Sequence, residues 1–219
     1  AVLELVVLDW IRELLGLPTG TSGILASGGS MANFTAFAAC FAVKGRGAVY
    51  LNDQTHASLK RNIASLGIPP EDMRILKTGA DLKFDMGVLA EAIAADRKSG
   101  KKPVLVIANG GTTNTGTADP LHAVADLCAQ HDLWMHVDGA YGAPAALTAK
   151  GGHPGNDAQH AVIRRWSAGG GGEFQADEAG ANHHHVVVAE IAGLFGRGLV
   201  LHAKMRFELL QQIQEVDPP

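Results

Sequence analysis

Apolar and polar positions along the first 148 residues follow two periods, one typical of helices and one typical of buried strands. Within residues 2–16, Leu3, Val6, Val7 and Trp10 recur at steps of three and four, which predicts an amphipathic helix. Similar patterns with helix start and stop signals predict four more helices, over residues 30–43, 58–66, 85–95 and 119–131.

Short apolar runs separate these helices. The run over 103–108 has no polar interruption, as expected of a parallel strand that is buried on both faces. Strands are predicted at residues 48–52, 73–77, 103–108 and 133–137. This alternation predicts an α/β fold, a mostly parallel sheet flanked by helices, with ligands at the carboxyl ends of the strands.

The pattern changes after about residue 148. We therefore expect one domain over 1–150 and an atypical tail over 151–219, irregular at 151–182 and mainly helical at 186–214, where residues 186–195 fit either a helix or a strand. The tail holds the run His183–His185, but three adjacent side chains of a regular element cannot all face one ion. A solvated tract is thus favoured over a metal site. The chain starts inside a predicted helix, so we expect a fragment.

Composition narrows the classes of partner. Of the 219 residues, 18 are Lys or Arg and 22 are Asp or Glu; the resulting net charge of −4 argues against a broad nucleic-acid surface. No apolar run approaches the roughly 20 residues of a membrane span. Cys40 and Cys128 lie in apolar helical patterns and do not suggest a disulfide framework, so a cytoplasmic location is expected.

The segment from His136 to Tyr141 is the strongest candidate for chemistry. The predicted strand at 133–137 delivers Asp138 to its carboxyl end, and the small residues Gly139 and Ala140 follow at once. A buried carboxylate needs a cationic mate, and small residues let a flat ring approach the backbone. The pyridinium nitrogen of pyridoxal 5′-phosphate (PLP) meets both demands. A metal ligand, a helix cap and a solvent-facing Asp remain alternatives.

Two further loops fall at the same predicted edge. A small-residue loop is predicted over 19–30 and leads into a helix; its last residues, Gly28, Gly29 and Ser30, indicate an anion site, although an ordinary helix cap is equally compatible. The loop has neither the Lys of a P-loop nor the GxGxxG pattern. His56 follows the strand at 48–52, where it is placed either to stack on a flat ring or to cap the next helix.

The loop over 109–116 is rich in Gly, Thr and Asn. Its hydroxyl and amide groups suit the polar edge of a ligand, but the same residues favour an ordinary turn. Together the four features place a phosphate cradle, a ring partner, a hydroxyl cluster and a carboxylate at one sheet edge. That convergence favours a PLP site.

Residues 1–148 resemble the large domain of the group II PLP-dependent decarboxylases, the fold-type I family that includes aromatic-L-amino-acid and glutamate decarboxylases. Five motifs carry the resemblance, in matching order and spacing: Trp10-Ile-Arg-Glu-Leu-Leu-Gly-Leu-Pro18, Ser27-Gly-Gly-Ser-Met-Ala-Asn33, Asp53-Gln-Thr-His56, Gly111-Thr-Thr113 and His136-Val-Asp-Gly-Ala140.

The resemblance implies a role for each matching residue. Gly28, Gly29 and Ser30 would hold the phosphate, and His56 would stack on the ring. Thr113 would hydrogen-bond the cofactor or position Asp138, whose carboxylate would pair with the pyridinium nitrogen. Ala140 would pack on the other ring face. The implied activity is that of a carboxy-lyase, which releases CO₂ from an L-amino acid through an external aldimine. Family members are homodimers, so a homodimer is implied.

One family feature is missing. The Schiff-base lysine of the family lies in an Asp-x-His-Lys motif roughly thirty residues beyond the pyridinium Asp, where this chain has only Ser and Ala followed by the glycine run 169–172. After Asp138 the only lysines are Lys150 and Lys204; Lys204 is a weak candidate. Two alternatives follow: a catalytically degenerate fragment that only binds PLP or dimerises, and another fold-type I enzyme such as an aminotransferase or desulfurase, which the motif pairing disfavours.

Overall fold

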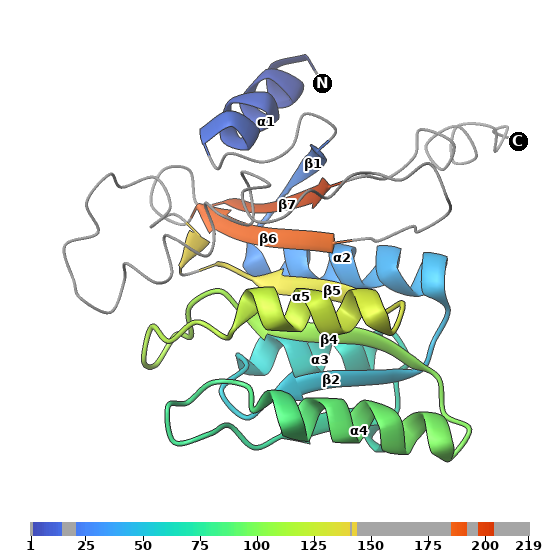
Figure 1. Cartoon of the computed structure of the whole chain (residues 1–219). Coiled ribbons are helices and arrows are strands. Elements are labelled where there is room, and N and C mark those ends of the chain that lie inside the picture. Colours follow the sequence, from blue (N-terminus) through green and yellow to red (C-terminus); the bar gives the residue numbers. More distant parts are fainter. Residues whose placement is uncertain (1, 15–20, 141, 144–184, 192–196, 204–219) are drawn as a thin grey trace, which may run out of the picture.

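The computed structural model describes residues 2–14, 21–140, 142–143, 185–191 and 197–203 (Figure 1). The strands are β1 (Thr21–Ala26), β2 (Ala48–Asn52), β3 (Met73–Leu76), β4 (Pro103–Asn109), β5 (Trp134–Asp138), β6 (His185–Ile191) and β7 (Arg197–Ala203). The helices are α1 (Val2–Leu14), α2 (Gly29–Lys44), α3 (Ala57–Ser65), α4 (Met86–Lys98) and α5 (Leu121–Gln130), with a short 3₁₀ turn η1 (Pro70–Asp72).

All seven described strands belong to one sheet in the order β1-β7-β6-β5-β4-β2-β3. Strands β3, β2, β4, β5 and β6 are parallel to one another, whereas β7 is antiparallel to both β6 and β1. In register, Asn109 of β4 lies opposite Asp138 of β5. The predicted α/β class with a mostly parallel sheet flanked by helices is confirmed, and the carboxyl ends of β2, β4 and β5 share one edge.

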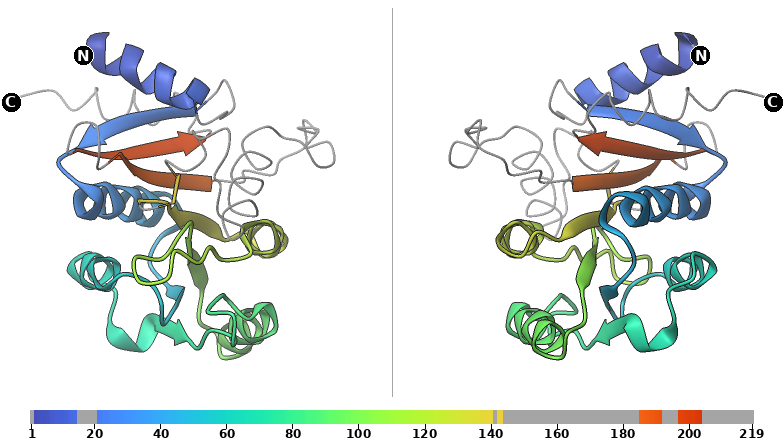
Figure 2. Two further views of the ribbon diagram at one scale, coloured as in Figure 1. Left: turned by 90° about the vertical axis from the view of Figure 1, so that its left-hand side faces the viewer. Right: turned by 90° about the vertical axis from the view of Figure 1, so that its right-hand side faces the viewer.

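Helices cover both faces of the sheet. Figure 2 shows α2 and α3 on one side and α4 and α5 on the other. Side chains alternate along β5 accordingly: Trp134 packs in the core beneath α2 and α3, whereas Met135 and Val137 pack in the core beneath α4 and α5. Asp138 therefore shares its face with Trp134 and His136, the face that α2 covers.

Helix α1 forms where the apolar spacing predicts it, but only part of its apolar surface is buried. Leu8 and Ile11 are its buried apolar side chains, while Leu3 and Trp10 are 81% and 61% exposed. The helix lies over β1, where Glu4 accepts a hydrogen bond from the backbone N–H of Leu25. The described residues thus leave much of the apolar surface of α1 open.

Two sequence-based predictions of local structure are wrong. Residues 21–26, expected as part of a small-residue loop, form β1. The helix expected over 186–214 is replaced in its described parts by strands β6 and β7, which pair with each other and with β5 and β1. Backbone pairing on both sides overrides weak local periodicity, and the run Val186–Val188 suits a strand. Residues 151–182, 192–196 and 204–214 lie outside the described residues.

The domain boundary expected near residue 150 does not coincide with an edge of the sheet. Strands β6 and β7 come from beyond that position and complete the same sheet as β1 to β5. We retain 1–150 as a proposed PLP-binding unit because the predicted site residues fall within it. No helix among the described residues is both long and apolar enough to cross a membrane.

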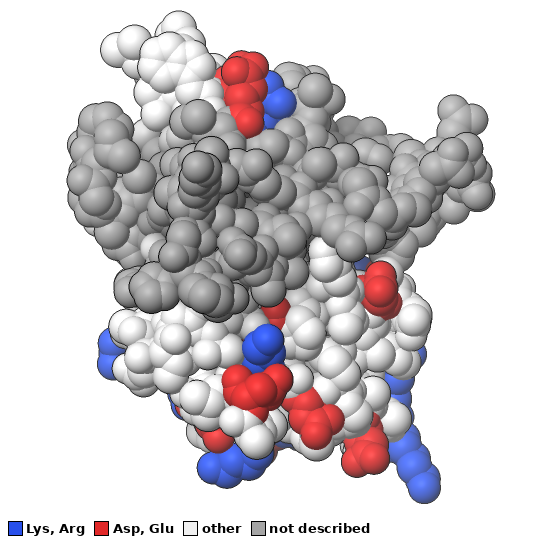
Figure 3. Space-filling model, turned by 60° about the vertical axis from the view of Figure 1, so that its left-hand side comes forward, with Lys and Arg blue, Asp and Glu red and all other residues white. Residues whose placement is uncertain are grey.

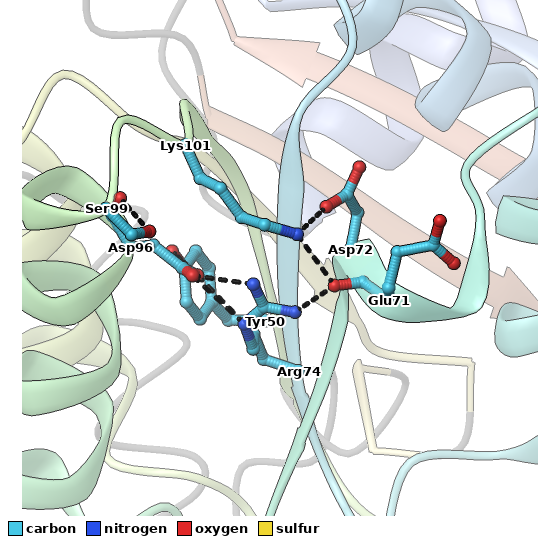
Figure 4. Close-up of polar contacts among 7 residues, drawn as sticks. All are labelled: Tyr50, Glu71, Asp72, Arg74, Asp96, Ser99 and Lys101. Atoms are coloured by element: carbon cyan, nitrogen blue, oxygen red, sulfur yellow. Dashed lines mark hydrogen bonds and ion pairs between the residues drawn. The ribbon is translucent and has the colours of Figure 1, made fainter.

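A buried polar cluster joins β2, β3 and α4 away from the carboxyl edge (Figure 4). Tyr50 donates to Asp96 at 2.7 Å, and Arg74 donates to both oxygens of the same carboxylate. Burial opposes ionisation of Asp96, but the hydrogen bonds from Arg74 and Tyr50 prevail and hold its pKa below the usual range. On the described surface in Figure 3, acidic and basic side chains are intermixed.

Candidate functional site

Asp138 is the last residue of β5 and is 9% exposed. Its side-chain Oδ1 accepts a hydrogen bond from the backbone N–H of Ala140 at 3.2 Å, and its backbone oxygen accepts one from Gly110 at 2.7 Å. These contacts fix a largely buried carboxylate at the carboxyl edge of the sheet, on the face toward α2. Such a carboxylate is stabilised best by a cationic, hydrogen-bonding partner.

Two contacts set the direction of α2 across β5. Near the end of α2, the Lys44 ammonium lies 2.6 Å from Asp132, just before β5 begins. Nearer the start of α2, Asn33 lies 2.7 Å from Nε2 of His136, two residues before β5 ends. Helix α2 is therefore antiparallel to β5. Gly29 lies one helical turn before Asn33, about 6 Å along the helix, and Asp138 lies two residues after His136, about 6.6 Å along the strand. Because the helix and the strand run in opposite directions, Gly29 and Asp138 lie at the same end of this pair.

The start of α2 offers backbone donors. Gly28 is the N-cap and has no side chain to engage the first N–H groups. A Cβ built on Gly28 would meet no atom of the described residues within 4 Å, so none of them crowds the backbone at this cap. Ser30 is exposed, and its backbone oxygen accepts from Asn62 of α3 at 2.7 Å, which ties this turn down. Free N–H groups and the positive dipole end fit a phosphate.

His56 lies in the β2–α3 loop and is exposed. Its Nδ1 is 2.8 Å from the Ser58 hydroxyl and accepts from the Ser58 backbone N–H, so the ring caps α3. The capping interpretation is thus confirmed. Capping also holds the ring at the site edge, which is what stacking on a ligand requires, so the two roles are compatible.

The β4–α5 loop is locked by its own hydroxyl groups. Thr112 and Thr115 share a hydrogen bond of 2.7 Å, and Thr115 donates to Thr117 at 2.9 Å. Thr112 is buried, whereas Thr113 is exposed. Of the hydroxyl groups in the predicted loop 109–116, those of Thr112 and Thr115 therefore bond to each other, while Thr113 is exposed and takes part in neither bond.

Close backbone packing explains the glycines around Asp138. A Cβ on Gly142 would lie 1.8 Å from the carbonyl oxygen of Gly110, and one on Gly111 would lie 3.0 Å from Cα of Gly142. The segment after β5 is thus pressed against the loop after β4. Ala140, predicted to pack on a ring face, is partly buried and lies two residues before Gly142.

His136 lies beneath the site and is fully buried. Its ring meets that of Phe37 edge-on, with centroids 4.7 Å apart. Burial lowers the pKa of His136 to about 3, so the imidazole is neutral at physiological pH. Because the Asn33 oxygen can only accept, Nε2 carries the proton, and Nδ1 is a buried acceptor with no hydrogen-bond partner among the described residues. A neutral His136 adds no positive charge beside Asp138.

Sequence reasoning missed a buried network of three residues at this edge. Asn52 and Asn109 are the last residues of β2 and β4, and both donate to the carboxylate of Asp119, which is 3% exposed. Burial raises the pKa of Asp119, although hydrogen bonds from Asn109, Phe84 and Asn52 oppose that shift. The available signal was an Asn ending each of two otherwise apolar strands.

The predicted site residues Gly28, Gly29, Ser30, His56, Thr113, Asp138 and Ala140 all lie in loops or element ends at the carboxyl edge of the parallel strands. Their individual roles stay predictions. The weak lysine candidate Lys204 and also Lys150 lie outside the described residues.

Comparisons with known proteins agree with this geometry. The family model described as the pyridoxal-dependent decarboxylase conserved domain matches residues 40–154. An aromatic-L-amino-acid decarboxylase of Bacillus atrophaeus is 42% identical over 154 residues, covering 68% of this chain and 32% of that protein. A cysteine sulfinic acid decarboxylase of Rattus norvegicus is 33% identical, covering 76% and 36% respectively.

Solved structures show the same fold. The crystal structure of mouse CSAD superposes with a TM-score of 0.76 at 25% identity and covers 100% of this chain and 44% of that chain. An Oryza sativa TDC with PLP and tryptamine gives 0.72 at 24% identity, covering 98% and 47%. The chain spans about a third of the length of the curated relatives it matches. The family match covers more than half of the chain, which therefore belongs to the pyridoxal-dependent decarboxylase family.

Proposed function

We propose that this chain binds PLP at the carboxyl edge of its sheet and supplies the cofactor-binding part of a carboxy-lyase that releases CO₂ from an L-amino acid. The observation that carries the proposal is the placement of Asp138. Its carboxylate is largely buried on the face of β5 that α2 covers, and the uncapped start of α2 points toward it. A helix start that offers backbone N–H donors and a buried carboxylate at the same sheet edge suit a ligand with a phosphate at one end and a protonated ring nitrogen at the other.

Each site residue would contact a different part of that ligand. Gly28, Gly29 and Ser30 would bind the phosphate through backbone N–H groups and a hydroxyl. His56 would lie against the ring, and Asp138 would keep the ring nitrogen protonated. When bound, PLP supplies an electron sink for the electron pair left behind by departing CO₂.

Thr113 and Ala140 would complete the contact surface, one as a hydroxyl partner and one as an apolar surface at the ring. The proposal extends to the fold-type I arrangement of such enzymes. The relatives' names differ in the amino acid acted on, so we propose an L-amino acid without naming one.

A second candidate function is a PLP-binding or dimerisation module without catalysis. A specific observation favours it: the sequence after Asp138 contains only two lysines, Lys150 and Lys204, and strands β6 and β7 contain none. Lysine is the residue that links PLP covalently to such enzymes. Without a positioned lysine, PLP would bind through phosphate and ring contacts alone.

Binding is tested with pyridoxamine 5′-phosphate, whose amine cannot condense with lysines. We expect reversible binding that weakens about tenfold in Asp138→Asn, the size of one charge-assisted hydrogen bond, with competition by inorganic phosphate unchanged. Wild-type protein that binds no pyridoxamine 5′-phosphate would contradict the carboxy-lyase and the PLP-binding module, and would leave only the dimerisation module.

Catalysis is tested separately, by release of labelled CO₂ from carboxyl-labelled L-amino acids in the presence of PLP. Release supports the carboxy-lyase, and binding without release supports the module. An absorbance band of a covalent PLP–lysine bond that disappears in Lys204→Ala would identify Lys204 as the anchor.

We further propose a homodimer in the cytoplasm. The exposed apolar side chains of α1, including Leu3, Leu5 and Trp10, support a partner surface for the first part of the proposal. The two buried free cysteines are compatible with a reducing compartment. Light scattering during size-exclusion chromatography tests the dimer, because a monomer at micromolar concentration would contradict it.

A further inference from the structure

Three loops at the carboxyl edge converge on one carboxylate, that of Asp119. Its Oδ1 accepts from the Phe84 backbone N–H at 2.8 Å and from the Asn52 side chain at 2.9 Å. Its Oδ2 accepts from the Asn109 backbone N–H at 2.7 Å and from the Asn109 side chain at 2.9 Å. These donors belong to the segment before α4 and to the ends of β2 and β4. All the donors are neutral amides, so Asp119 acts here as a multiple acceptor and not as half of an ion pair.

One arm of this network leads to His56. The side-chain oxygen of Asn52 accepts from the Gln54 backbone N–H at 3.1 Å and from the Thr55 hydroxyl at 3.3 Å. Asp119 holds the amide of Asn52 in the orientation that makes these bonds, since its nitrogen must face the carboxylate. His56 follows Thr55 directly. The position of the turn in which His56 caps α3 therefore depends on Asp119, through Asn52.

A second arm leads to the loop of Thr113. The Asp119 backbone N–H donates to the Asn109 oxygen at 2.9 Å, and Gly110 bridges Ala118. Together with the bonds that the backbone N–H and the side chain of Asn109 donate to the Asp119 carboxylate, this clamps both ends of the loop 110–118. The position of Thr113 therefore depends on the same carboxylate as that of His56. The start of α2 is not part of the network.

We propose that Asp119 is a positioning residue that sets the His56 and Thr113 loops around the cofactor ring without touching the cofactor. This inference rests on the proposed PLP site. It goes beyond that site because it predicts a split: ring contacts depend on Asp119, and phosphate contacts do not.

Asp96 provides a matched control. It is also a buried carboxylate, 6% exposed against 3% for Asp119, and it also gathers several donors from neighbouring elements (Figure 4). Its partners Tyr50 and Arg74 lie away from the carboxyl edge. Asp96→Asn and Asp119→Asn each remove one charge and change no volume. A purely structural role for Asp119 predicts the same outcome for both variants.

The first test is amide hydrogen exchange of the full chain. In Asp119→Asn we expect exchange over 53–56 and 110–117 to rise about tenfold, as after the loss of one charge-assisted hydrogen bond, while residues 29–33 keep wild-type rates. In Asp96→Asn the 53–56 and 110–117 segments should stay at wild-type rates. A uniform rise over all segments in Asp119→Asn would overturn the proposal. This readout does not need PLP, so it remains decisive if the proposed function fails.

The second test measures the split in binding at a temperature where both variants are folded. Asp119→Asn should weaken pyridoxamine 5′-phosphate about tenfold and leave the affinity for inorganic phosphate unchanged, while Asp96→Asn should alter neither. Equal weakening of both ligands in Asp119→Asn would contradict the positioning role. A wild type that binds phosphate but not pyridoxamine 5′-phosphate would instead count against the proposed function.

Should Asp119→Asn fail to fold, Asn52→Ala tests mainly the arm that leads to His56. It removes the link to Gln54 and Thr55 and the 3.0 Å bond from the Asn109 side chain, but leaves the backbone bonds between Asn109 and Asp119 intact. We expect faster exchange at 53–56 and unchanged exchange at 110–117. Equal changes in both segments would contradict the two-arm arrangement.

Discussion

His136 on β5 donates a 2.7 Å hydrogen bond to the side-chain oxygen of Asn33 on α2. Both residues are buried, Asn33 at 2% exposure and His136 at 0%. The bond joins the helix that begins at the proposed phosphate site to the strand that ends at Asp138. It therefore fixes the spacing between the two ends of the proposed cofactor site, and its loss has a measurable cost.

We predict that Asn33→Ala lowers the free energy of unfolding by about 1–3 kcal/mol, because Nε2 of His136 is left as a buried donor without an acceptor. Urea denaturation followed by circular dichroism measures the change. Thr35→Ala, which removes only a hydroxyl that bonds within α2, serves as the control and should stay within about 0.5 kcal/mol of wild type. Equal values for the two variants would contradict the role of the bond.

The buried imidazole also predicts a pH dependence. The pKa of His136 is about 3 in the folded protein, against about 6.5 in the unfolded chain. Between these two pKa values the unfolded chain binds a proton at His136 and the native state does not. The contribution of His136 to the free energy of unfolding is therefore complete above about pH 6.5 and decreases as the pH falls toward 3. The expected loss is about 1.4 kcal/mol per pH unit in that window.

His136→Gln isolates this effect. The unfolding free energy of wild type should fall between pH 6.5 and 5.0 by about 2 kcal/mol more than that of the variant. Titration of Asp119, which acts with the opposite sign, is common to both proteins and cancels in the difference. Parallel pH profiles of the two proteins would show that the imidazole is not desolvated as described.

Gly142→Ala should destabilise the fold strongly, because its Cβ would lie 1.8 Å from the backbone oxygen of Gly110 and neither backbone segment can yield cheaply. We expect a loss of about 3 kcal/mol, the upper end for overpacking. Gly79→Ala makes the same chemical change where the Cβ would meet only a movable carboxylate oxygen of Asp81 at 3.0 Å. Thermal unfolding of the two variants should differ clearly, and a stable Gly142→Ala would contradict the close approach.

The two cysteines should be unreactive in the native state. Burial raises the pKa of Cys128 to about 12 and that of Cys40 further, so almost no thiolate exists near neutral pH. We predict that Ellman's reagent modifies neither thiol without denaturant and both in unfolding concentrations of it. Rapid native labelling of one cysteine would show that its helix opens locally.

Local sequence predicted strands β2, β4 and β5 well, and the edge of the sheet formed by β1, β7 and β6 poorly. The strands β2, β4 and β5 and the helix α2 were found within about two residues, because their apolar runs are long and uninterrupted. Strand β1 falls in a predicted loop because Ser22 and Gly23 weaken its apolar pattern. It is a strand because it pairs with β7, from the far end of the chain, and such pairing leaves no local signal.

The candidate site divides in the same way. Asp138, His56 and Gly28 were found because each belongs to a contiguous motif at an element end. Asn52, Asn109 and Asp119 were missed because each looks like an ordinary turn or cap residue on its own. Only the parallel register, which brings the ends of β2 and β4 together, reveals that one carboxylate serves both.

The antiparallel strand β7 has a consequence for biosynthesis. During translation, β1 leaves the ribosome early but has no strand to pair with until residues 197–203 emerge. Over that interval the nascent chain presents an open strand before α2, and open strand edges invite association with other chains. A ribosome that stalls or terminates between residues 143 and 197 would release a product with β1 unpaired, a natural client for chaperones or proteases.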